Sequence, residues 1–467
     1  MSAATGVGAV LRGVAHLSVG TTLVQVMVAV SQAVLVVWLS PEEFGLWATA
    51  TASLAVLTGL VNFGEVNGYL ASGEDRLREA RRAIWRLNGL LVIGSVAVGV
   101  GYWLSGRPEL ALLVALIGVN IPLLGESNLL YAAYVRRREN GSIVRAQVAS
   151  GLARTAVGLA VAWLTGSAVA LALAVLAYSV VMIVLLAPRT RAWVSGSGDR
   201  MTRLGWRARR AWSVQALCQL LPTQVDFLVV ALVAGPTLLG LYFFAYQVTV
   251  GLSTVVAGPL AKSVLAALAA QDGRGRPVLA ERLMSIVAAG VGTAVAVAVG
   301  AITLVGGVLP GDWEAAAPVI AMLLASLPAR FLTALSDAVQ MAAGSWWRSA
   351  ALNAVDAVGT AAVALTAITG DITVLAVSMV AWKTVVMVVR VWRCPLDLSA
   401  QRRMAVVAPA VLVAGALTAA ALVGGPSLWL LTVGALAVCG TRIAVAWRGG
   451  RVAAPPPRAV AAESSWS

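Results

Sequence analysis

Apolar segments of about 20 residues recur along the whole chain, and each is long enough to cross a bilayer as a helix. Of the 467 residues, 60% are hydrophobic and 12% are charged, whereas a soluble domain carries roughly 25% charged residues. A water-soluble core has no room for so many apolar blocks of this length. The pattern therefore predicts an all-α polytopic membrane protein and excludes a soluble globular domain.

The apolar blocks predict about fourteen transmembrane helices. Their expected ranges are 14–39, 44–70, 83–104, 109–134, 141–165, 168–187, 211–234, 238–262, 284–309, 314–342, 349–369, 371–391, 405–423 and 426–447.

Arginine is concentrated in alternate loops of this arrangement. Clusters follow the second, fourth, sixth, eighth and twelfth spans, while the loops on the other side carry mainly Asp and Glu. The net charge of +14 would suggest nucleic acid in a soluble protein, but a one-sided distribution is the topology signal of a membrane protein. The basic side faces the cytoplasm, so both termini are expected there and no nucleic-acid partner is predicted.

Two pairs of segments indicate an internal repeat. Residues 40–47 and 235–242 share a small residue, a proline, a glycine, a leucine and an aromatic residue in the same order, at an offset of 195 (Pro41 to Pro236). A second match joins 141–182 to 344–387 at an offset of 203 to 205, such as Gly141 to Gly344. Each copy holds six spans, and since six is even, both copies enter the membrane from the same side. The sequence thus predicts two parallel six-helix lobes around a central cleft.

This repeat divides the chain into lobes, a linker and an appendix. The predicted parts are an N-lobe at 14–187, a basic cytoplasmic linker at 188–210, a C-lobe at 211–391, two further helices at 405–447 and a disordered cytoplasmic tail at 448–467.

Polar residues at helical spacing mark equivalent spans of both lobes. Gln25 and Asn62 belong to such stripes in the N-lobe, and Gln219 and Thr333 belong to stripes in the C-lobe. Polar side chains within a membrane either hydrogen-bond between helices or face water and protein in a cavity. Both interpretations remain open for any one residue. The five polar stripes, on the predicted spans one, two, seven, eight and ten, together favour a cleft filled with water.

Eight charged residues are interpreted as lying within the membrane rather than near the end of a span, each at a cost of roughly 2.5–3.5 kcal/mol on insertion scales unless it is paired or hydrated. They are Glu65, Glu126, Asp226, Asp337, Asp356, Arg154, Arg330 and Lys383. One interpretation is that cations pair with acids on neighbouring spans. The alternative is functional, in which the cations bind phosphate and the carboxylates carry a coupling ion.

Motifs of other protein classes are missing from the sequence. There is no glycine-rich phosphate loop ending in Lys-Ser or Lys-Thr, no cluster of residues with metal-ligand spacing, and no soluble segment large enough for a catalytic domain. We therefore expect no enzyme activity, no cofactor and no metal centre.

The two matching turns also resemble a known family. Leu39–Trp47 is similar to the first-hairpin signature, and Asp226 with Gly235–Tyr242 and Ala245–Tyr246 is similar to the span-seven/eight signature, of polysaccharide (O-antigen-type) flippases. These belong to the multidrug/oligosaccharidyl-lipid/polysaccharide (MOP) exporter superfamily. The similarity in layout covers roughly residues 10–400, and its specific motifs are these two turns.

The resemblance implies a flippase in the bacterial cytoplasmic membrane. It would move undecaprenyl-pyrophosphate-linked oligosaccharide across the bilayer by alternating access, driven by a proton or sodium gradient, with a polysaccharide polymerase as a further partner. Arg154, Arg330 and Lys383 are then the candidate pyrophosphate contacts, with Gln25, Asn62, Gln219 and Thr333 lining the cleft. The candidate ion-coupling acids are Asp226, Glu65, Asp337, Asp356 and Glu126.

Three alternatives remain. A peptidoglycan-precursor flippase of the superfamily typically has several arginines in the N-lobe cavity, and only Arg154 is available here. A multidrug exporter commonly has an acid in the first span, where this chain has Gln25 and Gln32. A membrane scaffold that recruits biosynthetic enzymes would need no cleft.

Overall fold

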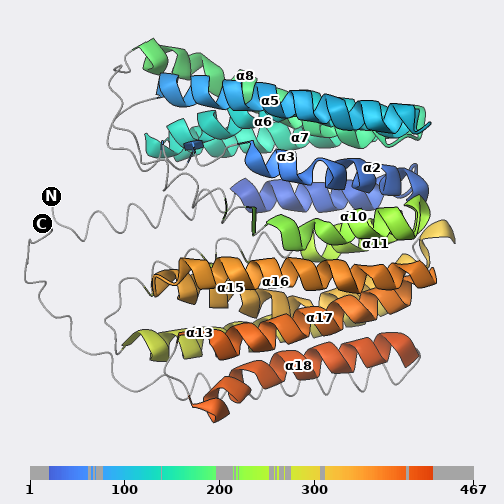
Figure 1. Ribbon diagram of the computed structural model, residues 1–467, viewed down its shortest axis with the longest axis vertical. Helices are drawn as coiled ribbons and strands as arrows, with labels where there is room; N and C mark the ends of the chain where they lie inside the picture. Colours follow the sequence, from blue (N-terminus) through green and yellow to red (C-terminus); the bar gives the residue numbers. More distant parts are fainter. Residues whose placement is uncertain are drawn as a thin grey trace, which may run out of the picture.

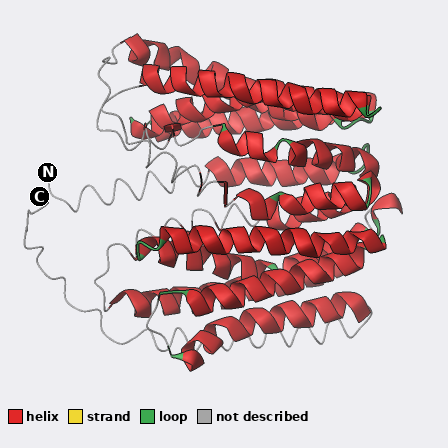
Figure 2. Cartoon of the chain, viewed as in Figure 1, coloured by secondary structure: helices red, strands yellow, loops and turns green. Residues whose placement is uncertain are grey.

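The structure is a computed structural model that describes residues 20–61, 77–137, 139–195, 220–251, 275–305, 311–395 and 399–423, with isolated positions between these ranges. Every regular element in the described residues is a helix (Figure 2). Nine of these helices are long and apolar enough to cross a membrane, and the shorter apolar helix Gly20–Leu35 precedes them. The chain is thus a multi-pass membrane protein. The count of fourteen spans stays a prediction, because 426–447 and parts of other spans lie outside the described residues.

The N-terminal half contributes one group of helices, which we call the N-lobe. It contains Gly20–Leu35, α2 (Pro41–Ser53), α3 (Ala55–Leu60), α5 (Leu77–Leu104), α6 (Pro108–Arg136), α7 (Asn140–Thr165) and α8 (Val169–Ser195). In Figure 1, α5 to α8 lie side by side at one end of the molecule, and α2 and α3 lie nearer its middle.

The second half contributes the C-lobe. Its elements are η1 (Leu221–Thr223), α10 (Val225–Val233), α11 (Pro236–Tyr246), the π-helix η2 (Gln247–Gly251), α13 (Gly275–Val305), η4 (Gly311–Trp313), α14 (Ala316–Ala325), α15 (Leu327–Ala342), α16 (Trp346–Ala364), η5 (Leu365–Thr369) and α17 (Ile372–Arg393). Helix α18 (Ala400–Val423) follows and packs on α13, α14 and α17. Helices α10 and α11 face α2 in the middle of the molecule (Figure 1).

Three helices, α5, α13 and α18, begin five or more residues before the predicted spans, and the extensions of α5 and α13 are the longest. Helix α5 starts at Leu77 rather than at 83, and α13 starts at Gly275 rather than at 284. The added turns carry arginine and glutamate, which are good helix formers, so each helix continues past the apolar segment. Hydropathy marks the segment that fits the bilayer and not the end of the helix.

The second span is broken at Leu54, between α2 and α3. Three hydroxyl side chains just before the break bond back to carbonyls one turn earlier: Thr49 to Gly45 (2.8 Å), Thr51 to Trp47 (3.0 Å) and Ser53 to Thr49 (2.8 Å). Such bonds compete with the helical ladder and bend helices. The polar residues of this stripe therefore also shape the backbone.

Three C-lobe spans are irregular as well. The seventh contains the 3-10 turn η1 with Pro222, the eighth passes into a π-helix after Tyr246, and the tenth breaks at Ser326, two residues before Pro328. Proline cannot donate its backbone nitrogen and clashes with the preceding turn, while π-helical turns are frequent at functional sites.

The two lobes meet at the turns that match in the sequence. A Cβ atom on Gly45 of α2 would collide with the carbonyl oxygen of Pro236, and one on Gly240 of α11 would collide with that of Pro41. Pro41 corresponds to Pro236 in the repeat, and Gly45 corresponds to Gly240. The contact is thus reciprocal: each turn meets the other through equivalent residues, as two subunits related by a two-fold axis do. We call these four residues the seal.

Aromatic side chains surround the seal. Phe44 of α2 meets Phe244 of α11 edge to face at 6.0 Å, and both pack on Trp313, at 5.1 and 4.8 Å between ring centroids. All three rings are buried. Aromatic pairs of this geometry add about 0.5–1.5 kcal/mol beyond the area that they bury. The lobes are therefore closed against each other at the end predicted to face outward.

Candidate functional site

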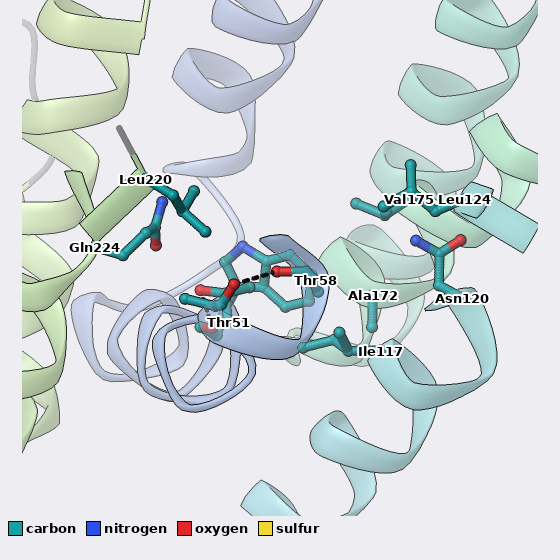
Figure 3. A pocket seen from close by; sticks show the side chains of 11 residues that line it. Thr51, Thr58, Ile117, Asn120, Leu124, Ala172, Val175, Leu220 and Gln224 are labelled. Atoms are coloured by element: carbon teal, nitrogen blue, oxygen red, sulfur yellow. Dashed lines mark hydrogen bonds between the residues drawn. The ribbon is translucent and has the colours of Figure 1, made fainter. Parts of the chain in front are cut away.

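A cavity of about 210 Å³ lies between the lobes next to the seal. Figure 3 shows Thr51 and Thr58 of the N-lobe in its middle, Asn120 on α6, and Leu220 and Gln224 of the C-lobe opposite them. Most of the other lining side chains are apolar. Pockets for small ligands typically measure 300–1,000 Å³, so a large polar substrate would need the lobes to part.

Arg154 of α7 lies inside the N-lobe and is half-buried. It makes no hydrogen bond or ion pair with the described residues. The group that interacts with it electrostatically is the Tyr178 phenol of α8. A neutral phenol does not compensate a guanidinium charge. In the described part of the chain, Arg154 is thus a cation that no carboxylate neutralises.

Asp226 of α10 is buried, with 2% of its surface exposed. Its carboxylate accepts a hydrogen bond from the Tyr242 hydroxyl at 2.9 Å and one from the Phe227 amide at 3.0 Å. No lysine or arginine of the described residues lies within ion-pair distance of it. Neutral donors therefore hold this carboxylate, which makes it different from the other buried acids of the C-lobe.

Arg330 of α15 lies close to this group. Its Nε donates to the Ser326 hydroxyl at 3.2 Å, and its guanidinium carbon lies 5.4 Å from the centroid of the Tyr246 ring, a cation–π distance. Like Arg154, it forms no ion pair with the described residues. Within the described residues, Arg154 and Arg330 thus share this lack of an ion pair, one in each lobe.

Lys383 of α17 differs from the two arginines because it is paired. Its Nζ lies 2.7 Å from Asp356 and 2.8 Å from the Thr360 hydroxyl, both on α16. The Trp382 indole also donates to Asp356, at 3.1 Å. For Lys383, the interpretation that intramembrane cations pair with acids on neighbouring helices therefore holds.

A second buried ion pair was not predicted from the sequence. Arg390 of α17 donates to Asp337 of α15 at 2.6 Å and to Asn353 of α16 at 2.6 Å, and only 1% of its side chain is exposed. Arg390 lies at the edge of the predicted twelfth span and was not counted as an intramembrane charge. The spacing of seven residues from Lys383, two helical turns on the same face, is the signal that could have found it.

Glu126 of α6 is also paired. Arg81 of α5 binds it at 2.8 Å and the Trp85 indole donates to it at 2.8 Å. Gln25 and Thr333 are half-buried on their helices, and so is Glu65. Asn62 and Gln219 lie outside the described residues.

Comparisons with known proteins agree with this architecture. The model of a family described as "Polysaccharide biosynthesis protein" matches residues 34–318, more than half of the chain. A comparison with curated proteins found no match.

Solved structures share the fold. The chain resembles a MOP superfamily transporter from Pyrococcus furiosus, whose report notes a binding pocket of reverse polarity, with 14% identity, a TM-score of 0.52, and coverage of 85% of this chain and 96% of that one. It also resembles a multidrug resistance MATE family transporter of the same superfamily in an outward-facing conformation, with 13% identity, a TM-score of 0.54 and the same coverage.

The resemblance inferred from the two turns is thereby confirmed at the level of family and fold. The chain belongs to the polysaccharide biosynthesis protein family, and its fold is that of the MOP superfamily transporters.

Proposed function

We propose that this protein is a flippase that moves a lipid-linked oligosaccharide, with undecaprenyl pyrophosphate as the carrier, from the inner to the outer leaflet of a bacterial cytoplasmic membrane. The lobes would open alternately to either side, with an ion gradient as the driving force. Membership in a polysaccharide biosynthesis family of transporter fold supports this proposal. The orientation with both termini in the cytoplasm remains part of it.

The observation that carries the proposal is the pair of arginines that form no ion pair with a described carboxylate, Arg154 in the N-lobe and Arg330 in the C-lobe. A lipid-linked sugar crosses the membrane only if the charge of its phosphates is compensated. An arginine can hold phosphate through two parallel hydrogen bonds. Lys383 ranks third because Asp356 already binds it.

Asp226 is our first candidate for the coupling-ion site, with Glu65 as the second. The hydrogen-bond partners of Asp226 are a phenol and a backbone amide, so proton binding there would not first have to break an ion pair. Glu126, Asp337 and Asp356 rank lower because each is bound to an arginine or a lysine.

The test is genetic and biochemical. In a strain without the protein, surface polysaccharide should fall and the lipid-linked unit should accumulate on the inner leaflet. Arg330→Gln, at normal protein level, should reproduce this defect, and Arg330→Lys should restore it only in part because lysine lacks the two-pronged geometry. The exposed Arg402, which binds Glu281 at 3.4 Å, supplies the control Arg402→Gln. Full surface polysaccharide in the Arg330→Gln strain would contradict the assigned role.

A second candidate is a multidrug exporter, and the mainly apolar lining of the cavity between the lobes favours it. A solved structure of the same fold is that of a multidrug resistance transporter. Deletion would then leave surface glycans unchanged and sensitise the cells to cationic dyes.

A further inference from the structure

A small cavity surrounds Arg154 in the interior of the N-lobe, apart from the cavity between the lobes. Its volume is about 20 Å³, and four helices line it. Helix Gly20–Leu35 contributes Ser31 and Gln32, α7 contributes Arg154 and Thr155, and Trp47 of α2 and apolar residues of α8 complete the wall.

The polar groups of this cavity lack partners. Gln32 is 4% exposed, and its side-chain oxygen has no hydrogen-bond partner; the Thr155 hydroxyl is likewise buried and unpartnered. Arg154 has no ion pair with the described residues. A buried hydrogen-bonding group left unsatisfied costs about 1–3 kcal/mol, and the half-buried guanidinium of Arg154 adds the cost of a partly desolvated charge without a counter-ion. The Arg154 guanidinium and the Thr155 hydroxyl are donors that an occupant of this cavity can bind, whereas the unpartnered Gln32 atom is an acceptor, so Gln32 would offer an anion only its amide NH2 group.

The charge and the volume define this occupant. A cavity needs about 10–15 Å³ to hold one water-sized particle, so 20 Å³ admits one monatomic ion or one water and is too small for a phosphate. The wall offers a guanidinium, two hydroxyls and an amide, all of which can donate hydrogen bonds, and it contains no carboxylate. An anion satisfies these donors and the charge together, whereas water leaves the charge uncompensated.

We propose that the N-lobe cavity formed by Arg154, Thr155, Gln32 and Ser31 is a binding site for a small inorganic anion, of which chloride is the physiological example. The anion neutralises Arg154 while the seal is closed. If Arg154 also receives the carrier phosphate, which rests on the proposed function, the anion must leave when the phosphate binds. The site would then exchange an inorganic anion for the substrate in each cycle.

Binding of radioactive chloride to the purified full-length protein, in detergent and gluconate buffer, tests the proposal. Wild type should bind about one chloride per chain. Arg154→Gln should weaken binding at least a hundredfold, and Arg154→Lys should retain weaker binding. Thr155→Val, which keeps the shape and the charge of the side chain, should weaken chloride binding about tenfold, because it removes one hydrogen bond to the ion. The control is Arg145→Gln, the same change at an exposed position of the same helix, and it should bind as wild type does.

The results separate this inference from the proposed function. No chloride binding by wild type, or equal binding by Arg154→Gln and Arg145→Gln, would overturn the anion site. If Arg154→Gln does not fold, unchanged binding in Thr155→Val overturns it instead. Displacement of chloride by inorganic pyrophosphate would support the exchange. Chloride binding that pyrophosphate does not disturb would keep the anion site but remove Arg154 from the substrate site.

Discussion

The seal predicts how one methyl group should change the balance between conformations. A Cβ atom at Gly45 would lie 2.8 Å from the Cα atom of Pro236, with the carbonyl oxygen closer still. Carbon atoms in contact are normally about 3.5–4.0 Å apart, so Gly45→Ala should force α2 and α11 apart by about 1 Å. Overpacking of this kind costs about 1–3 kcal/mol, and the cost falls on the sealed state alone. The ratio of unsealed to sealed molecules should therefore rise about 5- to 150-fold.

Distance measurements between spin labels at Arg107→Cys and Thr369→Cys, in a variant without native cysteines, would show this shift. Both positions are exposed, and they lie in turns at the sealed end of the N-lobe and of the C-lobe. The wild-type distribution should be dominated by the sealed distance, and Gly45→Ala should add a longer component.

Symmetry and a matched control sharpen this test. Gly240→Ala should act as Gly45→Ala does, because a Cβ there would lie 2.6 Å from the carbonyl carbon of Pro41. The double variant should raise the free energy of the sealed state by less than the sum of the two single effects, because the first methyl group has already parted the helices. Gly101→Ala in α5 is the control, since a Cβ there meets nothing within 4 Å. Identical distance distributions in wild type, Gly45→Ala and Gly240→Ala would refute the reasoning.

Three further predictions concern the charges and the topology. Asp226→Asn should leave the protein folded but lower transport and flatten its dependence on pH in a vesicle assay; full pH-dependent transport would remove this acid from the coupling site. Asp337→Asn should destabilise the protein by about 3–5 kcal/mol in chemical unfolding, because its buried arginine partner would lose its carboxylate, whereas Glu281→Gln in an exposed pair should cost less than about 1 kcal/mol. Reporter fusions after Asp199 and after Asp312 should score as cytoplasmic and external, respectively, and equal scores would contradict both the topology and the parallel repeat.

Much of the fold could be predicted from the sequence because its signals are local in the chain. Apolar length locates the helices. The turns at residues 40–47 and 235–242 match in the sequence, but only the structure shows that they meet across the two lobes. The breaks at Leu54 and Ser326 were not predicted. The break at Leu54 follows hydroxyl groups that bond to their own helix, a spacing that also fits an unbroken helix lining a cleft. At Ser326 such a hydroxyl bond accompanies Pro328, which was not used as a helix breaker when the span was predicted.

The candidate site was less predictable because helical spacing does not give the neighbour on the next helix. Arg81 was taken as a loop residue, but the longer α5 brings it to Glu126. Asp337 was counted among the intramembrane acids with no partner named, and the structure shows that it binds Arg390 of α17. Only the packed helices show which cations have a carboxylate partner.

The reciprocal contact at the seal has a consequence for the ancestry of the molecule. Because Gly45 meets Pro236 just as Gly240 meets Pro41, two copies of a single lobe could close on each other through this surface with no further change. An ancestral gene for one lobe would then have encoded a homodimer with the same closure, and its duplication and fusion would have kept the closure intact. Substitutions elsewhere could afterwards diverge, giving each half its own arrangement of arginines and acids, while the shared glycines stayed fixed by the partner backbone.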